Sequence, residues 1–311
     1  MEHRKGISNI AFIGAGKIAH SLAPALFRSG FIISSVISRS AGSARHLSEE
    51  VHARTFSSDI NDLPHETDLI VLSVPDSMVA ELSVRLAQSR YNLSGKTVIH
   101  LSGALDASVL ASAAGQGAFT ASLHIMQTFP SKQPARIEGA YAAVESSNTE
   151  TAERLSEMCR KTGLIPFRVD SGLKAFYHLS GVFASNFMVS DFYNAAKSFY
   201  SCGIEKKSPG AEFSFERVIL PIASATLNNL KEGAGKAISG PVERGDEGTV
   251  ARHLLALSLN EAHLFMKLSY IVQSLSLLDL LLNRDGELSI SQKRIRQMLI
   301  SELKKTADHM N

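Results

Sequence analysis

The stretch IAFIGAGKIA, residues 10–19, decides the fold. Its four leading apolar residues predict a buried strand that runs directly into a glycine turn and then a helix. This is the GxGxxA form of the dinucleotide fingerprint: the first glycine permits the tight turn, the second admits the pyrophosphate, and the alanine keeps the helix close to the sheet. Free N–H groups at the helix start can bind the phosphates. The residues expected to contact a dinucleotide here are Gly14, Ala15, Gly16, Lys17 and Ile18.

The end of the next predicted strand bears on which dinucleotide is bound. The apolar run 31–38 ends in Ser38-Arg39-Ser40. A protein selective for NAD commonly has an acidic residue here that binds the ribose 2′-hydroxyl. In this chain Arg39 can pair with a 2′-phosphate, and both serines can donate to it. We therefore expect NADP(H), with an ordinary solvated arginine at a strand end as the alternative.

Short apolar runs and helical patterns alternate along the first half of the chain. This alternation predicts an α/β domain, a Rossmann doubly wound sheet that is mainly parallel with helices on both faces. After about Asp170 the strand signals stop and an all-α domain is expected, so the predicted domains are 1–169 and 170–311. The expected strands are 10–13, 31–38, 69–74, 97–101, 119–123, 141–144 and 164–167, and the later helices are 171–200, 213–232, 247–282 with possible breaks, and 291–309.

Composition excludes several classes of function. The 311 residues are 44% hydrophobic and carry a net charge of +2, which favours two packed domains and small solutes over nucleic acid. Cys159 and Cys202 show no metal-ligand or disulfide spacing, so we expect no metal and a reducing, cytoplasmic compartment. No apolar signal core is present, and the most apolar late stretch, 275–282, is short and broken by Asp279. No membrane segment is therefore expected.

Residues 173–187, LKAFYHLSGVFASNF, form a mostly apolar predicted helix with a polar stripe. At 100° per residue, Lys174 and His178 share with a glycine and a serine a stripe about 60° wide. Burying a lysine or an imidazole without a partner costs several kcal/mol, so the stripe faces either water or a pocket. We favour a pocket in which Lys174 or His178 donates a proton and Asn186 orients a ligand. The alternative is a solvated lysine and a hydrogen-bonded core histidine.

Polar residues also follow two central strands of the predicted sheet. Open α/β sheets bind ligands at the carboxyl ends of their strands. Ser102 and Gly103 end one strand and could offer a hydroxyl and an N–H to a substrate, whereas a structural cap is equally plausible. His124 follows the next strand and points to the same edge, although histidines in such places are more often satisfied structural groups.

The segment SGPVERGDEGTV, residues 239–250, predicts a loop followed by a helix start. Asp246 is expected to cap that helix, whose first turn holds Thr249. A helix start with Arg244 beside it could hold a substrate carboxylate. In the alternative interpretation, Arg244 and Asp246 pair with each other to hold the loop.

On these motifs the chain resembles the Rossmann-like oxidoreductases with a C-terminal helical domain of unknown function, relatives of pyrroline-5-carboxylate reductase, ketopantoate reductase and the 6-phosphogluconate dehydrogenase group. The similarity extends over almost the whole chain. It is carried by GAGKIA, SRS, VLSVPDSMV, HLSGAL, SLHIMQTF and, most specifically, KAFYHLSGVFASN and ISGPVERGDEGTVARHL. The resemblance implies an NADP-binding domain and a 6-phosphogluconate dehydrogenase C-terminal-like helical domain that builds the substrate pocket and forms a homodimer.

The resemblance also implies roles for individual residues. The turn with Val74 and Pro75 would flank the nicotinamide ribose, and Lys174 would act as general acid with His178 one turn later. We therefore expect an NADP(H)-dependent oxidoreductase that reduces a C=O or C=N group of a small anionic metabolite. The alternative is a non-catalytic NADP(H)-binding sensor or assembly protein.

Overall fold

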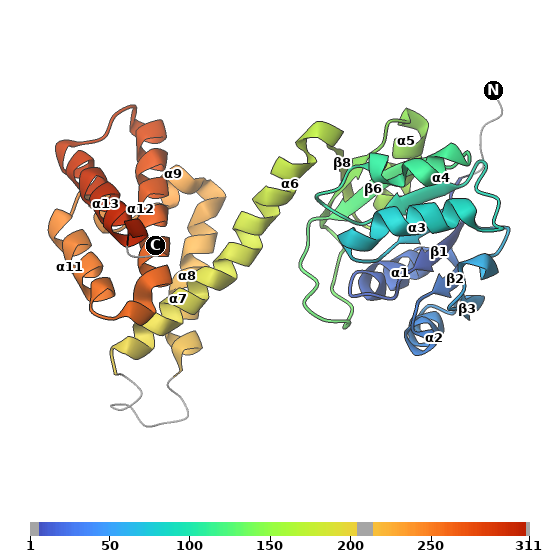
Figure 1. The fold of residues 1–311 in the computed structure, drawn as a ribbon, viewed down its shortest axis with the longest axis horizontal. Helices are drawn as coiled ribbons and strands as arrows, with labels where there is room; N and C mark the ends of the chain where they lie inside the picture. The colour runs from blue at the N-terminus through green and yellow to red at the C-terminus, as the bar shows by residue number, and fades with distance from the viewer. Residues whose placement is uncertain (1–5, 204–213, 309–311) are drawn as a thin grey trace. The chain divides into compact units, whose positions relative to one another are not determined.

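The computed structural model describes residues 6–203 and 214–308, and these divide into two compact units, 1–189 and 190–311 (Figure 1). The boundary expected at 169/170 follows the end of the strand pattern. The observed contacts place the first helix after the sheet in the same unit as the sheet, because that helix carries side chains that bond to the strand ends.

The first unit contains an eight-stranded sheet with the order β3-β2-β1-β4-β5-β6-β7-β8. β6 and β7 pair antiparallel, and the other neighbours pair parallel, which confirms the mainly parallel sheet. β3 was not predicted, because its three residues are largely exposed and form no apolar run. The strands are β1 (Asn9–Ile13), β2 (Ile32–Ile37), β3 (Thr55–Ser57), β4 (Leu69–Leu72), β5 (Thr97–His100), β6 (Phe119–Ile125), β7 (Tyr141–Glu145) and β8 (Ile165–Arg168).

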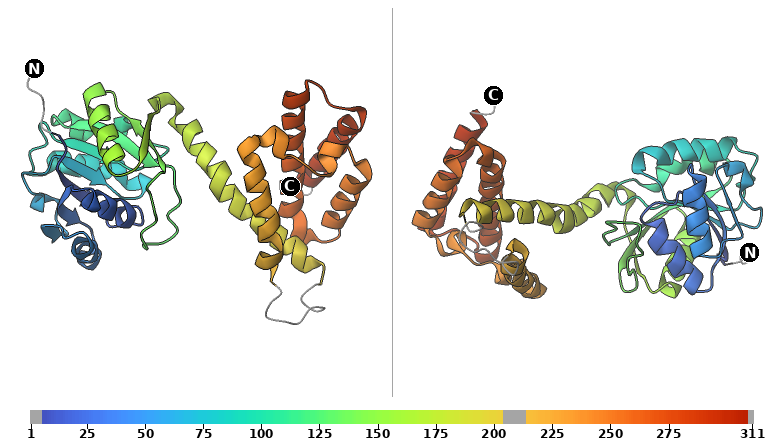
Figure 2. Two further views of the ribbon diagram at one scale, coloured as in Figure 1. Left: turned by 180° about the vertical axis from the view of Figure 1, so that it is seen from behind. Right: turned by 90° about the horizontal axis from the view of Figure 1, so that it is seen from below.

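Helices cover both faces of this sheet, as the sequence predicted (Figures 1 and 2). Alternate residues of β1 pack into two different cores: Ile10 and Phe12 join α1, α2 and α5 on one face, and Ala11 and Ile13 join α3 and α4 on the other. Burial on both faces is the reason that these strands are continuous apolar runs. The helices are α1 (Ala19–Arg28), α2 (Ala41–Glu50), α3 (Asp76–Gln88), α4 (Ala111–Gly115) and α5 (Thr149–Lys161), with short turns η1 (Ile60–Asp62) and η2 (Ala107–Leu110).

The helix expected over 171–200 is present in four consecutive segments. It begins as a short 3₁₀ turn, and a π-helical turn, a feature frequent at functional sites, interrupts its middle. The segments are η3 (Ser171–Leu173), α6 (Lys174–Gly181), η4 (Val182–Asn186) and α7 (Phe187–Ser201).

The described part of the second unit is helical throughout, as expected. Its core is formed by apolar residues of α10 to α13, among them Val250, Ile271, Leu278 and Ile295. The predicted helix ends at 213 and 309 lie outside the described residues. The helices are α8 (Phe215–Asn229), η6 (Leu230–Glu232), α9 (Ala234–Ala237), α10 (Pro241–Arg244), α11 (Glu247–Ser258), η7 (Glu261–His263), α12 (Leu264–Asp285) and α13 (Ile290–Asp308).

One helix in the described part, α12, is long and apolar enough to cross a membrane by length and composition alone, with a mean hydropathy of 1.4. Core helices of proteins outside membranes pass the same test. Ile271, Leu278 and Leu281 of α12 are buried in the core of the second unit. Its apolar character is thus used, at least in part, for packing within this unit.

Candidate active site

The glycine turn after β1 has the geometry that the fingerprint requires. Gly14 has φ +104°, and its N–H donates to the carbonyl of Ile37 at 2.7 Å. A Cβ added at Gly14 would lie 2.1 Å from the carbonyl oxygen of Ser73. Only glycine therefore fits, both because of its backbone conformation and because the ends of β1 and β4 approach so closely here.

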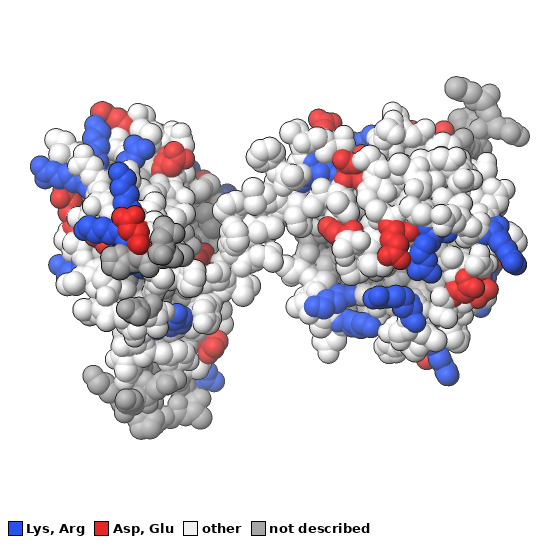
Figure 3. Space-filling view, viewed as in Figure 1, with Lys and Arg blue, Asp and Glu red and all other residues white. Residues whose placement is uncertain are grey.

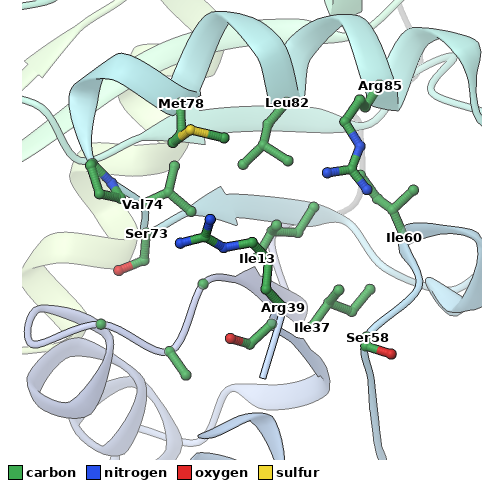
Figure 4. Close-up of a pocket in the computed structure, with 15 residues that line it drawn as sticks. Ile13, Ile37, Arg39, Ser58, Ile60, Ser73, Val74, Met78, Leu82 and Arg85 are labelled. Carbon is green, nitrogen blue, oxygen red and sulfur yellow. The ribbon is translucent and has the colours of Figure 1, made fainter. Parts of the chain in front are cut away.

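A pocket opens beside this turn, at the carboxyl ends of β1, β2 and β4 (Figure 4). It is open to solvent, and the space within it, including the open mouth, is about 830 Å³. None of the fifteen lining residues is acidic. Seven of the residues predicted to contact a dinucleotide line it, namely Gly14, Ala15, Gly16, Ser38, Arg39, Val74 and Pro75.

Three residues predicted to contact the dinucleotide are not part of the pocket lining. Ser40 caps α2, with its Oγ accepting from the N–H of Ser43 at 3.3 Å. Ile18 packs against the core below the turn, and Lys17 is exposed. Their predicted contacts with a dinucleotide stay predictions.

Sequence reasoning missed the wall of the pocket that α3 forms. Arg85 and Arg39 extend from α3 and from the end of β2 toward the same space (Figure 4). The side chain of Arg85 is about half exposed and has Glu81 of the same helix 3.9 Å away. No motif marks Arg85, because it lies 46 residues beyond Arg39 and only the packing of α3 brings the two together. Sequence reasoning also missed two further lining residues of α3, Met78 and Leu82, and two of the connection between β3 and β4, Ser58 and Ile60.

Lys174 is buried at the start of α6, with only 2% of its surface exposed. Its Nζ donates to the carbonyl of Ser102 at 3.2 Å and to Oγ of Ser122. Ser122 in turn donates to Glu145, a buried carboxylate that also accepts from the N–H of Ala107. Lys174 is therefore not the solvated lysine of the alternative interpretation.

Burial lowers the pKa of Lys174 to about 8, and the opposing charges of Glu145, Asp106 and Asp76 partly offset this effect. The ammonium has three N–H groups, and the hydrogen bonds to Ser102 and Ser122 use two of them. A group with this pKa is mostly protonated at neutral pH and gives up its proton readily. Such a lysine is suited to general acid–base chemistry.

Ser102 links the pocket to Lys174. Its Oγ donates to Oδ2 of Asp76 at 2.7 Å and accepts from the N–H groups of Ala104 and Leu105. The hydroxyl therefore caps this turn, as the structural alternative expected, and a contact of Ser102 with a substrate stays a prediction. Asp76 directly follows Pro75 of the pocket lining, so the pocket and the lysine lie on consecutive parts of the same sheet edge.

Two half-buried histidine rings, His124 and His178, lie against Gly103, and Tyr177 packs on His124. His124 Nδ1 shares a hydrogen bond of 2.7 Å with the hydroxyl of Tyr177, and the rings of His124 and His178 meet edge to face at 5.8 Å. A Cβ at Gly103 would lie 2.6 Å from Nδ1 of His178 and 2.9 Å from the ring of His124. Burial, assisted by His178 and Lys174, lowers the pKa of His124 to about 4. His124 is therefore a neutral imidazole at physiological pH.

The first unit thus brings together five predicted residues: Lys174, His178, Ser102, Gly103 and His124. Tyr177, Ser122, Glu145 and Asp76 were missed, because each is a single polar residue whose partner is distant in the sequence and no periodic pattern marks it. His100 was missed as well: it is fully buried between the N–H of Ser102 and the carbonyl of Asp106, and burial lowers its pKa to about 4.

The remaining predicted substrate residues are Asn186 and three residues of the second unit. Asn186 is exposed at the end of the π-helical turn. In the second unit Asp246 caps α11 as predicted, accepting from the N–H of Thr249 at 2.9 Å and from its hydroxyl at 2.7 Å. Thr249 also accepts from Arg252, and Arg244 ends α10. A role of Asn186, Arg244, Asp246 and Thr249 toward a substrate stays a prediction.

The surface charge is consistent with a small-molecule site. On the face shown in Figure 3, both units carry basic and acidic side chains, and much of the surface is uncharged. With a net charge of +2 over the chain, this distribution does not resemble a basic nucleic-acid footprint.

Comparisons with known proteins agree with this architecture. Residues 2–125 match the model of a Rossmann-like domain, and residues 140–271 match a domain of unknown function, DUF2520. No curated protein matches the chain.

Several solved structures are similar over most of their length. A protein from Bacteroides fragilis, provisionally assigned as an NADP oxidoreductase, is 29% identical with a TM-score of 0.70, covering 87% of this chain and 97% of its own. A protein from Thermotoga maritima is 20% identical with a TM-score of 0.60, covering 97% of this chain and 99% of its own. A reductive aminase from Aspergillus terreus, solved with NADPH and ethyl-5-oxohexanoate, is 15% identical with a TM-score of 0.57, covering 96% of this chain and 94% of its own. The last two likenesses concern the fold alone. This chain therefore combines a Rossmann-like domain with a C-terminal domain of unknown function, DUF2520, the pair of domains that the sequence predicted.

Proposed function

We propose that this protein is an NADP(H)-dependent oxidoreductase that reduces a C=O or C=N group of a small anionic metabolite. One observation carries the proposal: the hydrogen bond from Ser102 to Asp76 joins the end of the dinucleotide pocket to the cluster around Lys174. A dinucleotide whose phosphates lie at Gly14 to Gly16 and whose nicotinamide passes Val74 and Pro75 would end at that cluster. The similarity to the Bacteroides fragilis protein supports the same conclusion.

The choice of NADP(H) over NAD(H) rests on the charge of the pocket. Arg39 and Arg85 line it together, and no acidic residue lines it to bind a ribose 2′-hydroxyl. Two guanidinium groups suit a 2′-phosphate, which they can bind with charge-assisted hydrogen bonds.

Lys174 and His178 are the proposed catalytic residues. The bound nicotinamide would supply the hydride. A carbonyl that receives a hydride develops negative charge on its oxygen, and a protonated Lys174 at the Ser102–Gly103 turn can neutralise that charge by giving up a proton. His178 faces the same turn and is the second candidate donor. Because a cationic imine needs no such acid, these residues favour a carbonyl substrate. The anionic character of the substrate rests on the predicted role of Arg244.

A fluorescence titration with NADPH and NADH, followed by a screen of keto acids and imino acids, tests the proposal. Tighter binding of NADPH and its oxidation in the presence of one substrate class are expected. Equal affinity for both cofactors would remove the role of the arginines. NADPH binding without turnover of any compound would favour the alternative function, a non-catalytic NADP(H)-binding sensor or assembly protein.

Replacing Arg39 with alanine should weaken NADPH binding by about 10- to 100-fold, because hydrogen bonds to a charged group contribute roughly 1.5–3 kcal/mol. NADH, which has no 2′-phosphate, should bind almost unchanged. Arg45→Ala is the matched control, because Arg45 is exposed on α2 and pairs with Glu49 outside the pocket. Equal losses for both cofactors would show that Arg39 does not read the 2′-phosphate.

Replacing Gly103 with alanine should lower kcat at least about tenfold while leaving NADPH affinity unchanged, because a 1 Å misplacement of catalytic groups can be this costly. The added Cβ would overlap His178 and His124 and push both rings away from the turn. Gly115→Ala is the control, since a Cβ there has no neighbour within 4 Å. Steady-state NADPH oxidation measures the effect, and an unchanged kcat would argue against a role for this ring cluster.

A further inference from the structure

Outside the site described above, His20 of α1 and His46 and Glu50 of α2 form a compact group. Their ligand atoms all lie within 4.8 Å of one another, and Nδ1 of His20 is 2.8 Å from Oε2 of Glu50. The rings of His20 and His46 are 5.5 Å apart. His46 and Glu50 are four residues apart on one helix, so they occupy the same face of α2 and can bind one ion together.

The burial of His20 is not explained by hydrogen bonding. Its side chain is 1% exposed, and its Nε2 is buried without a hydrogen-bond partner among the described residues. A buried imidazole that is held by hydrogen bonds normally has both nitrogens paired, because each unpaired polar atom is costly. With an ion at Nδ1, Nε2 would carry the ring proton and stay unpaired, so the ion would stabilise the buried ring through Nδ1 alone, beyond the hydrogen bond to the partly exposed Glu50.

The neighbouring charges leave Glu50 available as a ligand. Arg45, the nearest basic residue along α2, pairs with Glu49 at 2.7 Å, whereas the ion pair described for Glu50 is with His20. His46 and Glu50 are exposed and can adjust by the small movements that ion binding requires.

From these contacts we propose that His20, His46 and Glu50 form a zinc site that links α1 to α2. Two imidazole nitrogens and one carboxylate oxygen suit Zn²⁺, with water completing a tetrahedral set. The site joins the helix that follows the glycine turn to the helix that follows Arg39, so its role is to stabilise this part of the sheet unit. It does not depend on the proposed oxidoreductase activity.

The test is a titration of the full chain with Zn²⁺ alone, in competition with a chromogenic chelator. About one Zn²⁺ should bind per chain with micromolar affinity or better, and Mg²⁺ should not replace it. His46→Ala and Glu50→Gln should each weaken binding at least about tenfold, because loss of even an outer-shell partner costs 10- to 100-fold. Both replaced residues are exposed, so the variants should fold.

Glu49→Gln and His65→Ala are the matched controls: Glu49 is adjacent to Glu50 but pairs with Arg45, and His65 is an exposed histidine elsewhere. Both should bind Zn²⁺ as the unmodified chain does. Zn²⁺ should also raise the Tm of the unmodified chain and of both controls, and at the same Zn²⁺ concentration it should raise the Tm of Glu50→Gln less. The proposal is overturned if the unmodified chain binds no Zn²⁺ at micromolar concentration. It is also overturned if His46→Ala and Glu50→Gln bind Zn²⁺ as tightly as the unmodified chain does.

Discussion

Gly14→Ala should abolish NADPH binding and lower the thermal stability of the sheet unit. The added Cβ would lie 2.1 Å from the carbonyl oxygen and 2.7 Å from the carbonyl carbon of Ser73, so the ends of β1 and β4 would have to separate. The φ of +104° adds backbone strain of about 1–3 kcal/mol for a residue other than glycine. Both effects fall on the turn that forms the phosphate end of the pocket.

Gly95→Ala separates these two effects. Gly95 also has a positive φ, +74°, but a Cβ there has no neighbour within 4 Å, and it does not line the pocket. Its replacement should therefore lower Tm less than Gly14→Ala does and leave NADPH binding intact. Thermal unfolding and NADPH fluorescence measure the two quantities. If Gly14→Ala still binds NADPH with normal affinity, the phosphates do not lie at this turn.

Replacing Lys174 with methionine should reduce kcat by about 10²- to 10⁴-fold, the usual contribution of a positioned general acid. NADPH affinity should stay within a few-fold of normal, because Lys174 does not line the dinucleotide pocket. Methionine retains much of the buried volume of the lysine side chain, so packing at the start of α6 is largely preserved. Lys161→Met serves as the control, because Lys161 is exposed on α5 and pairs with Glu157.

The pH dependence of the same reaction provides a second readout. Burial lowers the pKa of Lys174 to about 8, so its ammonium is present below that pH and is lost as the pH rises through it. In the direction of carbonyl reduction, kcat should therefore fall above about pH 8. The fall should be absent from the residual activity of Lys174→Met. A variant with an unaltered pH profile and near-normal kcat would leave His178 as the proton donor.

Several features of this protein followed from the sequence alone. The glycine turn, the cap at Asp246 and the apolar strands were predictable because each depends on residues adjacent or nearly adjacent in the chain. β3 escaped prediction because pairing with β2, rather than an apolar pattern, makes it a strand. Most of the fold could therefore be predicted from local backbone requirements and from the pattern of apolar residues along the chain.

The candidate site depended on contacts between distant parts of the chain. Lys174 bonds to Ser122, 52 residues away, and Ser102 bonds to Asp76, 26 residues away. The sequence showed that Lys174 needed a partner, but only the packing of α6 against the strand ends supplied one. The same packing lowers the pKa of the lysine, because desolvation depends on everything that surrounds the ammonium. Likewise, Arg85 joins Arg39 only through the position of α3, so the charge of the pocket was decided by the tertiary structure.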